Sequence, residues 1–470
     1  MVDDPSDTSA PWLDSDEIKG ILDKNKKEDP VKIREILAKA REMKGLNIAD
    51  VAALSQANSQ DLFDELYTTA KKLKEDIYGR RVVFFAPMYV SNLCANDCSY
   101  CAFRKSNRGL VRHYLSQEEV AEQTKILLNQ GHKRVLIIAG EAYPGGLDYI
   151  IKCIETIYSV KSNNGTVRRI NAELAPLSVE DFKKLKAAQI GTYVCFQETY
   201  DRDVYKQVHL RGPKRDFDWR ISTFDRAQQG GIDDVGLGVL FGLADWKYEI
   251  LALMKHIGHL EDRFGVGCHT ISFPRIEPAD GSELSRNPPH KVSDTDFKKL
   301  VAIMRLAVPY TGMIMSTRET PEMRRATLDL GVSQISAGSR TDPGGYSDKD
   351  DGSEKEPGQF SIGDHRTLDE VVRTISDEGF LPSFCTACYR LGRTGVDFMD
   401  LAKPGLIKDN CAPNAISTFM EYLMDYASPE TMEAGLKAIE REISDLSPQG
   451  QKLSRELIAQ VRSGKRDVFC

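Results

Sequence analysis

The chain has 470 residues, of which 41% are hydrophobic and 28% are charged, and its 63 basic and 70 acidic residues give a net charge of −7. This composition is typical of a globular protein and excludes a wholly disordered or collagen-like chain. A slightly acidic protein is also a poor candidate for broad binding to nucleic-acid phosphates. No apolar run approaches the ~18 residues that a membrane-spanning helix needs, so we expect neither a nucleic-acid nor a membrane partner.

The N-terminal residues are acidic rather than apolar. Residues 1–16 lack the hydrophobic segment of a signal peptide, so we expect a cytoplasmic protein. Thiols stay reduced in that compartment, and the ten cysteines therefore need a role other than disulfide formation.

Residues 12–80 are predicted to be helical, because apolar residues such as Ile33, Ile36 and Leu37 recur at helical spacing. Asn47 is a plausible N-cap within this region. We interpret residues 1–80 as an N-terminal helical extension without catalytic residues.

From residue 81 onward, short apolar runs alternate with amphipathic stretches of helical length. The predicted strands are Val82–Tyr89, Val135–Ala139, Ile170–Leu174, Thr192–Phe196, Val235–Leu240, His269–Phe273, Gly312–Met315 and Val332–Ser336. The predicted helices are Gln117–Asn129, Leu147–Val160, Val179–Ala188, Asp216–Gln229, Lys247–Arg263, Asp294–Ala307 and Pro321–Leu330. Such alternation indicates βαβ units and a parallel sheet. We predict a closed (β/α)8 barrel over residues 81–340, with its active site at the C-terminal ends of the strands; a doubly wound open sheet is the alternative.

The remaining third of the chain divides into a loop and a helical region. Residues 341–363 are rich in Gly, Asp, Ser, Lys and Pro, and we predict an exposed loop or linker over 341–366. Residues 367–470 are mostly helical in pattern and are predicted to form a C-terminal domain that carries a second group of cysteines.

The first group of cysteines directly follows the first predicted strand. Cys94, Cys98 and Cys101 are spaced as Cys-x3-Cys-x2-Cys in a polar, turn-forming loop. Three thiolates this close can hold three corners of a 4Fe–4S cluster. A structural zinc site needs a fourth protein ligand, which this loop does not supply. The fourth iron of such a cluster is open to an exogenous ligand.

This spacing, with Tyr100 just before the third cysteine, resembles the signature of the radical S-adenosylmethionine (SAM) enzymes. The resemblance implies that SAM chelates the open iron and is cleaved to methionine and a 5′-deoxyadenosyl radical, which abstracts hydrogen from the substrate. A zinc knuckle or a chance cluster of cysteines is the alternative.

Further residues at the ends of predicted strands agree with this resemblance. The run Ala139-Gly140-Glu141 matches, imperfectly, the Gly-Gly-Glu element that receives the SAM amino group, with alanine replacing the first glycine. Glu173 is a candidate partner for a ribose hydroxyl or the amino-acid moiety. Gly238 and Leu240, at the end of the fifth strand, lie where family members place backbone against adenine. Each of these signals is weak alone.

The second group consists of Cys385 and Cys388, separated by two residues, and Cys411 after 22 more. A Cys-x2-Cys pair is compatible with a zinc half-site or a redox pair. The redox interpretation lacks its βαβ context. The zinc interpretation lacks a fourth ligand, because the nearest histidine, His365, is far upstream. Three thiolates again suit an iron–sulfur cluster with one non-protein corner.

The run from Cys385 to Gly395, followed by Phe398-Met399, closely resembles the C-terminal motif of the HydG family, the tyrosine lyases that mature the active site of FeFe-hydrogenases. The resemblance covers nearly the whole chain, with both cysteine groups in order. It implies that the adenosyl radical attacks L-tyrosine and breaks its Cα–Cβ bond, giving p-cresol and dehydroglycine. Dehydroglycine then decomposes to carbon monoxide and cyanide at the second cluster, which carries an extra iron bridged by free L-cysteine. The implied product is an iron–carbonyl–cyanide–cysteine unit, passed to other maturation proteins that include a scaffold GTPase.

Two candidate sites complete the interpretation. Arg318, just after the seventh predicted strand, can hold the tyrosine carboxylate through its bidentate guanidinium, and Ser316 can add a hydrogen bond. The alternative is a capped surface helix. The resemblance implies that a histidine in the region of His269 binds the extra iron, whereas a hydrogen-bonded core histidine is the alternative. The other four cysteines, Cys153, Cys195, Cys268 and Cys470, are assigned no role.

Two rival functions remain open. The thiamine-pathway tyrosine lyase, 2-iminoacetate synthase, shares the barrel and the first step but lacks the second cysteine group. A non-catalytic iron–sulfur or zinc scaffold is the rival from another class, and SAM cleavage distinguishes it.

Overall fold

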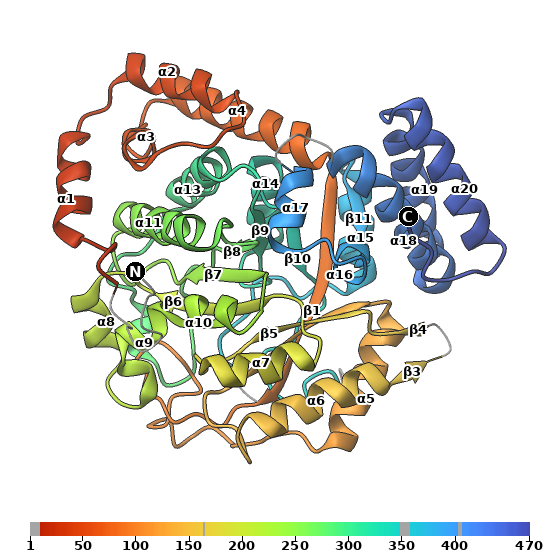
Figure 1. Ribbon diagram of the computed structural model, residues 1–470, viewed down its shortest axis with the longest axis horizontal. Coiled ribbons are helices and arrows are strands. Elements are labelled where there is room, and N and C mark those ends of the chain that lie inside the picture. Colours follow the sequence, from red (N-terminus) through yellow and green to blue (C-terminus); the bar gives the residue numbers. More distant parts are fainter. Residues whose placement is uncertain (1–9, 163–164, 348–357, 403–406) are drawn as a thin grey trace.

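A closed barrel of eight parallel strands forms the centre of the molecule (Figure 1). The computed structural model describes the backbone of residues 10–162, 165–347, 358–402 and 407–470. The barrel strands are β1 (Arg81–Ser91), β2 (Arg134–Ala139), β5 (Arg169–Glu173), β6 (Tyr193–Glu198), β7 (Val235–Val239), β8 (Thr270–Ser272), β9 (Gly312–Met315) and β10 (Gln334–Ser336). Neighbours pair in chain order and β10 pairs back onto β1. This closure confirms the (β/α)8 barrel and excludes the open sheet.

Helices between the strands surround the barrel. They are α5 (Gln117–Gln130), α6 (Leu147–Ser159), α7 (Val179–Ala187), α8 (Arg202–Val208), α9 (Phe217–Ile221), α10 (Thr223–Gln229), α11 (Trp246–Phe264), α12 (Glu283–Arg286), α13 (Asp294–Ala307) and α14 (Pro321–Leu330), with a 3-10 turn at Pro213–Arg215. The predicted single helix over Asp216–Gln229 is wrong. It is divided at Ser222, whose hydroxyl donates to the carbonyl of Asp218 and accepts from the Arg226 guanidinium.

The N-terminal extension is helical, as predicted. It comprises α1 (Ser15–Lys24), α2 (Pro30–Ala40), α3 (Ile48–Leu54) and α4 (Gln60–Tyr78), which cover one side of the barrel in Figure 1. Asn47 caps α3 in a capping box, because its side chain accepts from the Asp50 amide and the Asp50 carboxylate accepts from the Asn47 amide.

Three short strands lie outside the predicted set. A hairpin of β3 (Lys161–Ser162) and β4 (Gly165–Thr166) precedes β5. The strand β11 (Leu381–Ser383) adds to the sheet beside the start of β1, with Arg81 opposite Leu381 and Val83 opposite Ser383. Since β11 is parallel to the beginning of β1, the chain that follows it emerges at the N-terminal end of the barrel. This pairing decides where the second cysteine group lies.

The C-terminal region is helical. Its helices are α15 (Leu368–Asp377), α16 (Ala387–Arg390), α17 (Gly395–Ala402), α18 (Ile407–Tyr426), α19 (Pro429–Ser444) and α20 (Pro448–Arg462). The predicted linker at 341–366 is irregular where it is described, but it is not simply exposed: Gln359 and Phe360 line a cavity of the barrel. Residues 348–357 of this prediction lie outside the described residues.

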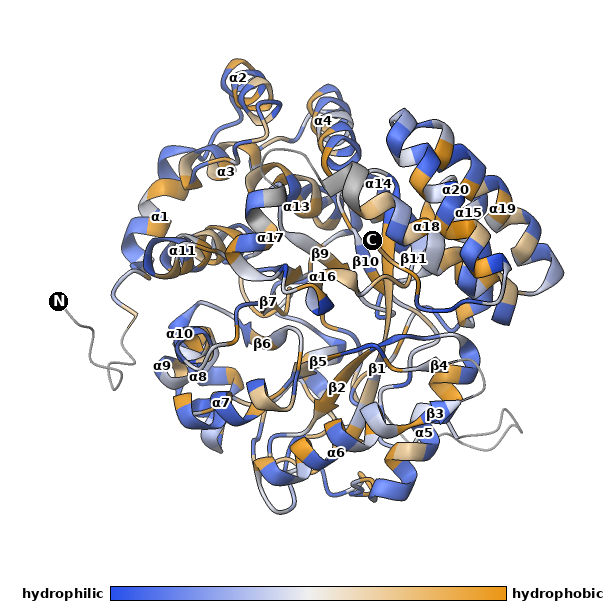
Figure 2. Ribbon diagram, turned by 45° about the vertical axis from the view of Figure 1, so that its right-hand side comes forward, coloured by the Kyte–Doolittle hydropathy of each residue, from blue (hydrophilic) through white to orange (hydrophobic). Residues whose placement is uncertain are grey.

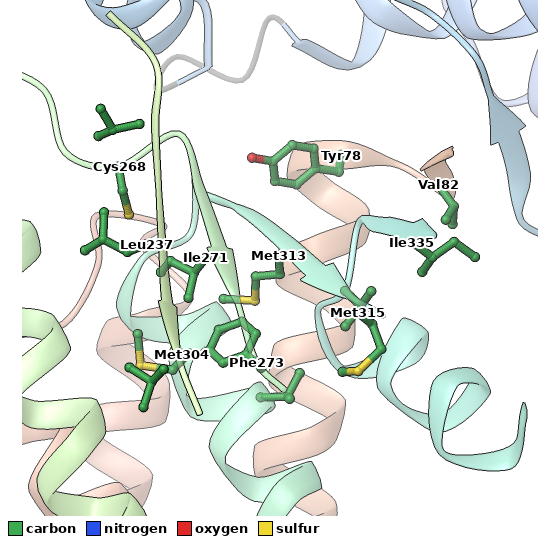
Figure 3. Packing of buried hydrophobic residues seen from close by; sticks show 14 of the residues in the cluster. Tyr78, Val82, Leu237, Cys268, Ile271, Phe273, Met304, Met313, Met315 and Ile335 are labelled. Atoms are coloured by element: carbon green, nitrogen blue, oxygen red, sulfur yellow. The ribbon is translucent and has the colours of Figure 1, made fainter. Parts of the chain in front are cut away.

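Side chains in the last four barrel strands alternate between two environments. Leu237, Ile271, Met313 and Ile335 are at most 1% exposed and face the surrounding helices. In Figure 3, Ile271 and Met313 lie on the side of Met304 of α13, whereas Ile335 lies beside Val82. Most of the intervening residues are small or polar, among them Gly236, Gly238, Thr270, Ser272, Gly312 and Ser336, whereas Ile314 is apolar and lines a cavity. The apolar strands and polar helix surfaces are evident in Figure 2. The small residues at the intervening positions leave room for cavities inside the barrel. Among the described residues, no helix is both long and apolar enough to cross a membrane.

Candidate active site

The first cysteine group lies at the C-terminal end of the barrel, as predicted. Cys94, Cys98 and Cys101 line one cavity together with Gly140 and Glu141 at the end of β2. Within the described part of the chain, no three His, Cys, Asp or Glu side chains converge as ligands of a single metal ion would. The residues nevertheless fit a larger cluster, because three thiols and a glycine backbone open onto the same space.

Arg112 holds the loop that carries these cysteines. Its guanidinium donates to the carbonyls of Asn92 and Phe103, both at 2.8 Å, and of Arg104 at 2.6 Å. One cation therefore ties together the two ends of the loop. Arg112 could not be predicted from a sequence motif, because its partners are backbone carbonyls, which every residue type carries.

Burial suppresses ionisation of the three thiols. It raises the pKa of Cys94, of Cys98 strongly and of Cys101 to about 11. Gln359 donates to the Cys101 sulfur at 3.8 Å, and its side-chain carbonyl accepts from Tyr89 at 2.8 Å. These thiols therefore become thiolates only when bound metal offsets the cost of burying the charge.

Gly140 is required by close approach of two backbones. A Cβ atom at this position would lie 2.3 Å from the carbonyl oxygen of Leu93, and the Gly140 amide donates to the carbonyl of Ser91 at 2.8 Å. The end of β2 is thus pressed against the cysteine loop, which explains why glycine precedes Glu141.

Two buried ion pairs line the same cavity. Glu141 accepts from Arg220 at 2.9 Å and from Asn96 at 2.6 Å, and Lys214 donates to Glu198 at 2.5 Å. Burial acts to raise the pKa of Glu141, but the charges of Arg220 and Lys214 outweigh it and lower the pKa. The sequence motif includes Glu141 but not Arg220 and Lys214, because these two residues lie in the connection between β6 and β7, far along the chain from the end of β2.

Of the three residues predicted to lie around the cofactor, Tyr100 lines the cavity, whereas Gly238 and Leu240 do not. Tyr100 lines it and donates through its hydroxyl to His209 at 2.8 Å. Leu240 packs in an apolar cluster with Tyr100 and Cys98. Gly238 and Leu240 are absent from the cavity wall itself; a Cβ at Gly238 would lie 2.4 Å from the Phe196 ring, which does line it. Of the four cysteines without a predicted role, Cys195 lines this cavity, Cys153 and Cys268 are buried elsewhere and Cys470 is exposed.

A second cavity adjoins the first and contains both predicted substrate residues. Ser316 and Arg318 line it, and Glu173, Phe196 and Gln359 belong to both cavities. The Arg318 guanidinium lies 3.2 Å from the ring centroid of Phe360. Burial lowers the pKa of Arg318, and the nearby Tyr89, Glu198 and Glu173 act in the opposite direction, because their negative charge favours the guanidinium cation. An aromatic ring and a guanidinium in one cavity suit an aromatic amino acid.

The second cysteine group lies at the opposite end of the barrel. Cys385 and Cys388 line a cavity together with residues at the starts of barrel strands, including Arg81, Arg134 and His269. Cys388 and Cys411 hydrogen-bond to each other, which with the charge of Arg81 lowers the pKa of Cys411, while the pKa of Cys388 is raised. These three thiols fit a cluster, because they meet in a buried site with cations that offset thiolate charge.

His269 is brought to this second cavity. It precedes β8 rather than starting it, and its Nε2 atom lies 3.4 Å from the Tyr389 hydroxyl. Its Nδ1 atom faces Asp234 at 3.6 Å, beyond a formed hydrogen bond. The Asp234 carboxylate accepts from the Gly395 amide at 2.9 Å, which links the barrel to the segment after the cysteine pair.

The chain is similar to known protein families and to solved structures. The Radical SAM superfamily model matches residues 88–257, and the model of the Biotin and Thiamin Synthesis associated domain matches residues 272–381. A crystal structure of HydG, a maturase of the FeFe-hydrogenase, is 46% identical, covers 98% of this chain and 100% of its own, and has a TM-score of 0.94. This chain belongs to the HydG family of radical SAM proteins. HydG from Carboxydothermus hydrogenoformans is 39% identical over 95% of this chain and 97% of its own, with a TM-score of 0.82.

A relative outside the HydG family is informative. The 2-iminoacetate synthase of Salmonella typhimurium is 33% identical over 335 residues, which are 71% of this chain and 85% of its own. Both family models end before Cys385. The second cysteine group therefore lies beyond the matched domains, in the part of the chain that the HydG structures cover. Membership of the radical SAM superfamily implies SAM and a 4Fe–4S cluster at the first group.

Proposed function

We propose that this protein is a radical SAM tyrosine lyase that cleaves L-tyrosine to p-cresol and dehydroglycine. Dehydroglycine is then converted to carbon monoxide and cyanide at an auxiliary iron–sulfur cluster, to build an Fe(CO)(CN)(cysteine) unit for maturation of FeFe-hydrogenase. The observation that carries the proposal is the placement of two cysteine groups at opposite ends of one barrel, with an arginine-containing cavity beside the first.

At the first site, Cys94, Cys98 and Cys101 hold the 4Fe–4S cluster. When bound, this cluster and SAM supply the 5′-deoxyadenosyl radical. Glu141, fixed as an anion by Arg220, is suited to the SAM amino group. In the proposed assignment Glu173 receives a ribose hydroxyl or the amino-acid moiety, and Tyr100, Gly238 and Leu240 shape the wall behind the cofactor.

The tyrosine substrate is assigned to the adjoining cavity. Arg318 binds its carboxylate and Ser316 adds a hydrogen bond. The Ser316 hydroxyl accepts from the Arg318 amide at 3.3 Å, so the serine is already held beside the arginine. Because Glu173 and Phe196 line both cavities, the substrate lies directly beside the SAM site.

The auxiliary cluster is assigned to Cys385, Cys388 and Cys411, with His269 holding the additional iron and free L-cysteine bridging it. The position of His269 in the same cavity as Cys385 and Cys388 supports this assignment. Imidazole is a suitable ligand for ferrous iron. The further partners in this proposal are other maturation proteins, including a scaffold GTPase, in the cytoplasm.

The test of the first half is product analysis. Reconstituted, reduced protein with SAM and tyrosine should form 5′-deoxyadenosine and p-cresol. The triple variant Cys94→Ala, Cys98→Ala and Cys101→Ala should form neither. Absence of both products from fully reconstituted wild-type protein contradicts the lyase proposal and favours a non-catalytic scaffold.

The alternative is a 2-iminoacetate synthase, favoured by the 33% identity to such an enzyme. Both functions give p-cresol, so only the second site discriminates between them. Infrared bands of Fe–CO and Fe–CN during turnover support the maturase function, and their absence from protein that holds both clusters supports the synthase.

A further inference from the structure

The segment after α20 runs along the helix that carries Cys411. The Cys470 amide donates to the Asn414 side chain at 2.8 Å, and the Ser417 hydroxyl donates to the carbonyl of Val468 at 2.8 Å. The Asp467 amide donates to Glu421 at 2.8 Å. Arg466 completes the series with Asp425 at 2.5 Å.

These partners form one stripe of α18. Asn414, Ser417, Glu421 and Asp425 are spaced by three or four residues, so they share one face of the helix. Cys411, three residues before Asn414, begins the same stripe. Residues 466–470 are therefore aligned along the face of α18 that leads to the thiol of Cys411.

Residues 466–470 also contact the segment that carries Cys388. The two terminal guanidinium nitrogens of Arg390, which lies two residues after Cys388, both donate to the Asp467 carboxylate, one of them at 2.7 Å. The guanidinium also lies 4.2 Å from the ring centroid of Phe469. A bidentate arginine–carboxylate pair sets orientation as well as distance.

A barrel residue anchors this contact. Arg168, just before β5, pairs with Asp467 at 3.1 Å and with Glu421, and its side chain is 5% exposed. Asp467 itself adopts the left-handed backbone conformation, with φ +61°. Its carboxylate thus joins α16 to Arg168 of the barrel, and its amide joins α18 through Glu421, in a conformation that a non-glycine residue rarely adopts.

We propose that residues 466–470 form a strap that holds the segments of Cys388 and Cys411 in register, with Asp467 as its positioning residue. The two thiols are separated by 22 residues in the sequence, so bringing them together costs loop-closure entropy, which the contacts of the strap help to offset. The proposal rests on the proposed function only in taking their meeting point as the auxiliary-cluster site.

The first test uses the metal-free protein, so that it does not depend on any cluster. Iodoacetamide labelling of Cys388, followed by mass spectrometry, should be about tenfold faster or more in Asp467→Ala and in Arg390→Ala, because each loses the charge-assisted pair. The double variant should label about as fast as Asp467→Ala, because Asp467→Ala already removes the pair with Arg390 as well as the pair with Arg168. Glu440→Gln, which changes the 3.6 Å pair with Arg455 between α19 and α20, is the control and should label as the wild type does.

The second test uses reconstituted protein. Asp467→Ala and the milder Asp467→Asn should lose iron toward half of the wild-type content while keeping the SAM-cleaving cluster and 5′-deoxyadenosine formation. Wild-type labelling rates and iron content in both Asp467→Ala and Arg390→Ala overturn the strap. Wild-type protein that holds iron for one cluster only contradicts the proposed function instead, and the labelling comparison then decides the strap alone.

Discussion

Glu173 lines both the cavity proposed for SAM and the adjoining cavity proposed for the substrate. Burial, together with the nearby Glu198, raises its pKa to about 7, although Arg318 acts in the opposite direction. At neutral pH a large share of the Glu173 carboxyl groups is therefore protonated and can donate a hydrogen bond. Glu141, only one strand away, remains a carboxylate because it is paired with Arg220. The two acids can thus serve different groups of one cofactor.

The raised pKa of Glu173 predicts a pH-dependent stability. Because its folded-state pKa lies above the ordinary value of 4.5, the carboxyl favours the folded state below pH 4.5 and this contribution is lost as pH rises to about 7. Glu173→Gln should therefore raise the thermal unfolding midpoint of metal-free protein more at pH 8 than at pH 5. Glu141→Gln is the control with opposite sign: its pKa is lowered, so the substitution should lower the midpoint at both values. An equal effect of Glu173→Gln at the two pH values contradicts the assignment.

Arg318 is proposed to bind the tyrosine carboxylate. Arg318→Ala should weaken tyrosine binding by roughly 1.5–3 kcal/mol, or one to two decades, since a charge-assisted bidentate contact is lost. Its iron content should be unchanged. Arg325→Ala, a half-exposed arginine on α14 that pairs with Asp329 and Glu378, is the matched control. Calorimetric titration of tyrosine measures the effect, and wild-type affinity in Arg318→Ala rejects the role.

At the scale of elements, the end of β2 and the cysteine loop after β1 act as one unit. The Gly140 backbone is so close to Leu93 that no side chain fits between them. The same strand end presents Glu141 to Arg220. A substitution at the end of β2 can therefore displace the residues proposed to bind SAM, although no cysteine is changed.

Gly140→Ala should reduce SAM binding strongly, because the new Cβ would meet the Leu93 carbonyl oxygen at 2.3 Å and backbone cannot rotate away. SAM affinity and iron content, measured separately, locate the defect. Gly258→Ala is the control, since no atom lies within 4 Å of its Cβ and it is within α11. It should bind SAM normally and gain about 0.5–1 kcal/mol of stability. Normal SAM binding by Gly140→Ala contradicts the close-approach argument.

At the scale of the whole molecule, the barrel separates two sites. The first lies where the strands end and the second where they begin, because β11 joins the sheet beside the first residues of β1. In the proposed function, radical cleavage and the assembly of an iron product occur at these separate sites and can be altered independently.

The double variant Cys385→Ala, Cys388→Ala should still form p-cresol, since the first site does not involve these residues, but it should lose the infrared bands of iron-bound carbon monoxide. His269→Ala should keep the iron of both clusters and lose mainly the additional iron. Infrared spectra under turnover and iron analysis provide the measurements. Normal Fe–CO and Fe–CN bands in the double variant mean that the second cluster is only structural.

Features that depend on neighbours along the chain were predictable from the sequence. Alternating apolar periodicities predicted the eight barrel strands, cysteine spacing predicted both thiol groups, and the run from Cys385 to Gly395 showed the resemblance to the HydG family. Asn47 and Ser316 are further examples, because caps and strand ends have local signatures.

Only the tertiary structure decided which distant residues share a site. Lys214 and Arg220 reach the first cavity from the connection between β6 and β7, and Gln359 reaches it from the segment after β10; no local pattern marks them. The second cysteine group was expected in a C-terminal domain, yet the pairing of β11 with β1 places it against the barrel beside His269. The strand β11 has three residues, too few for a periodic signal, and it forms only because the β1 edge offers backbone partners. The position of the second site is therefore a property of long-range pairing, which residues adjacent in sequence do not encode.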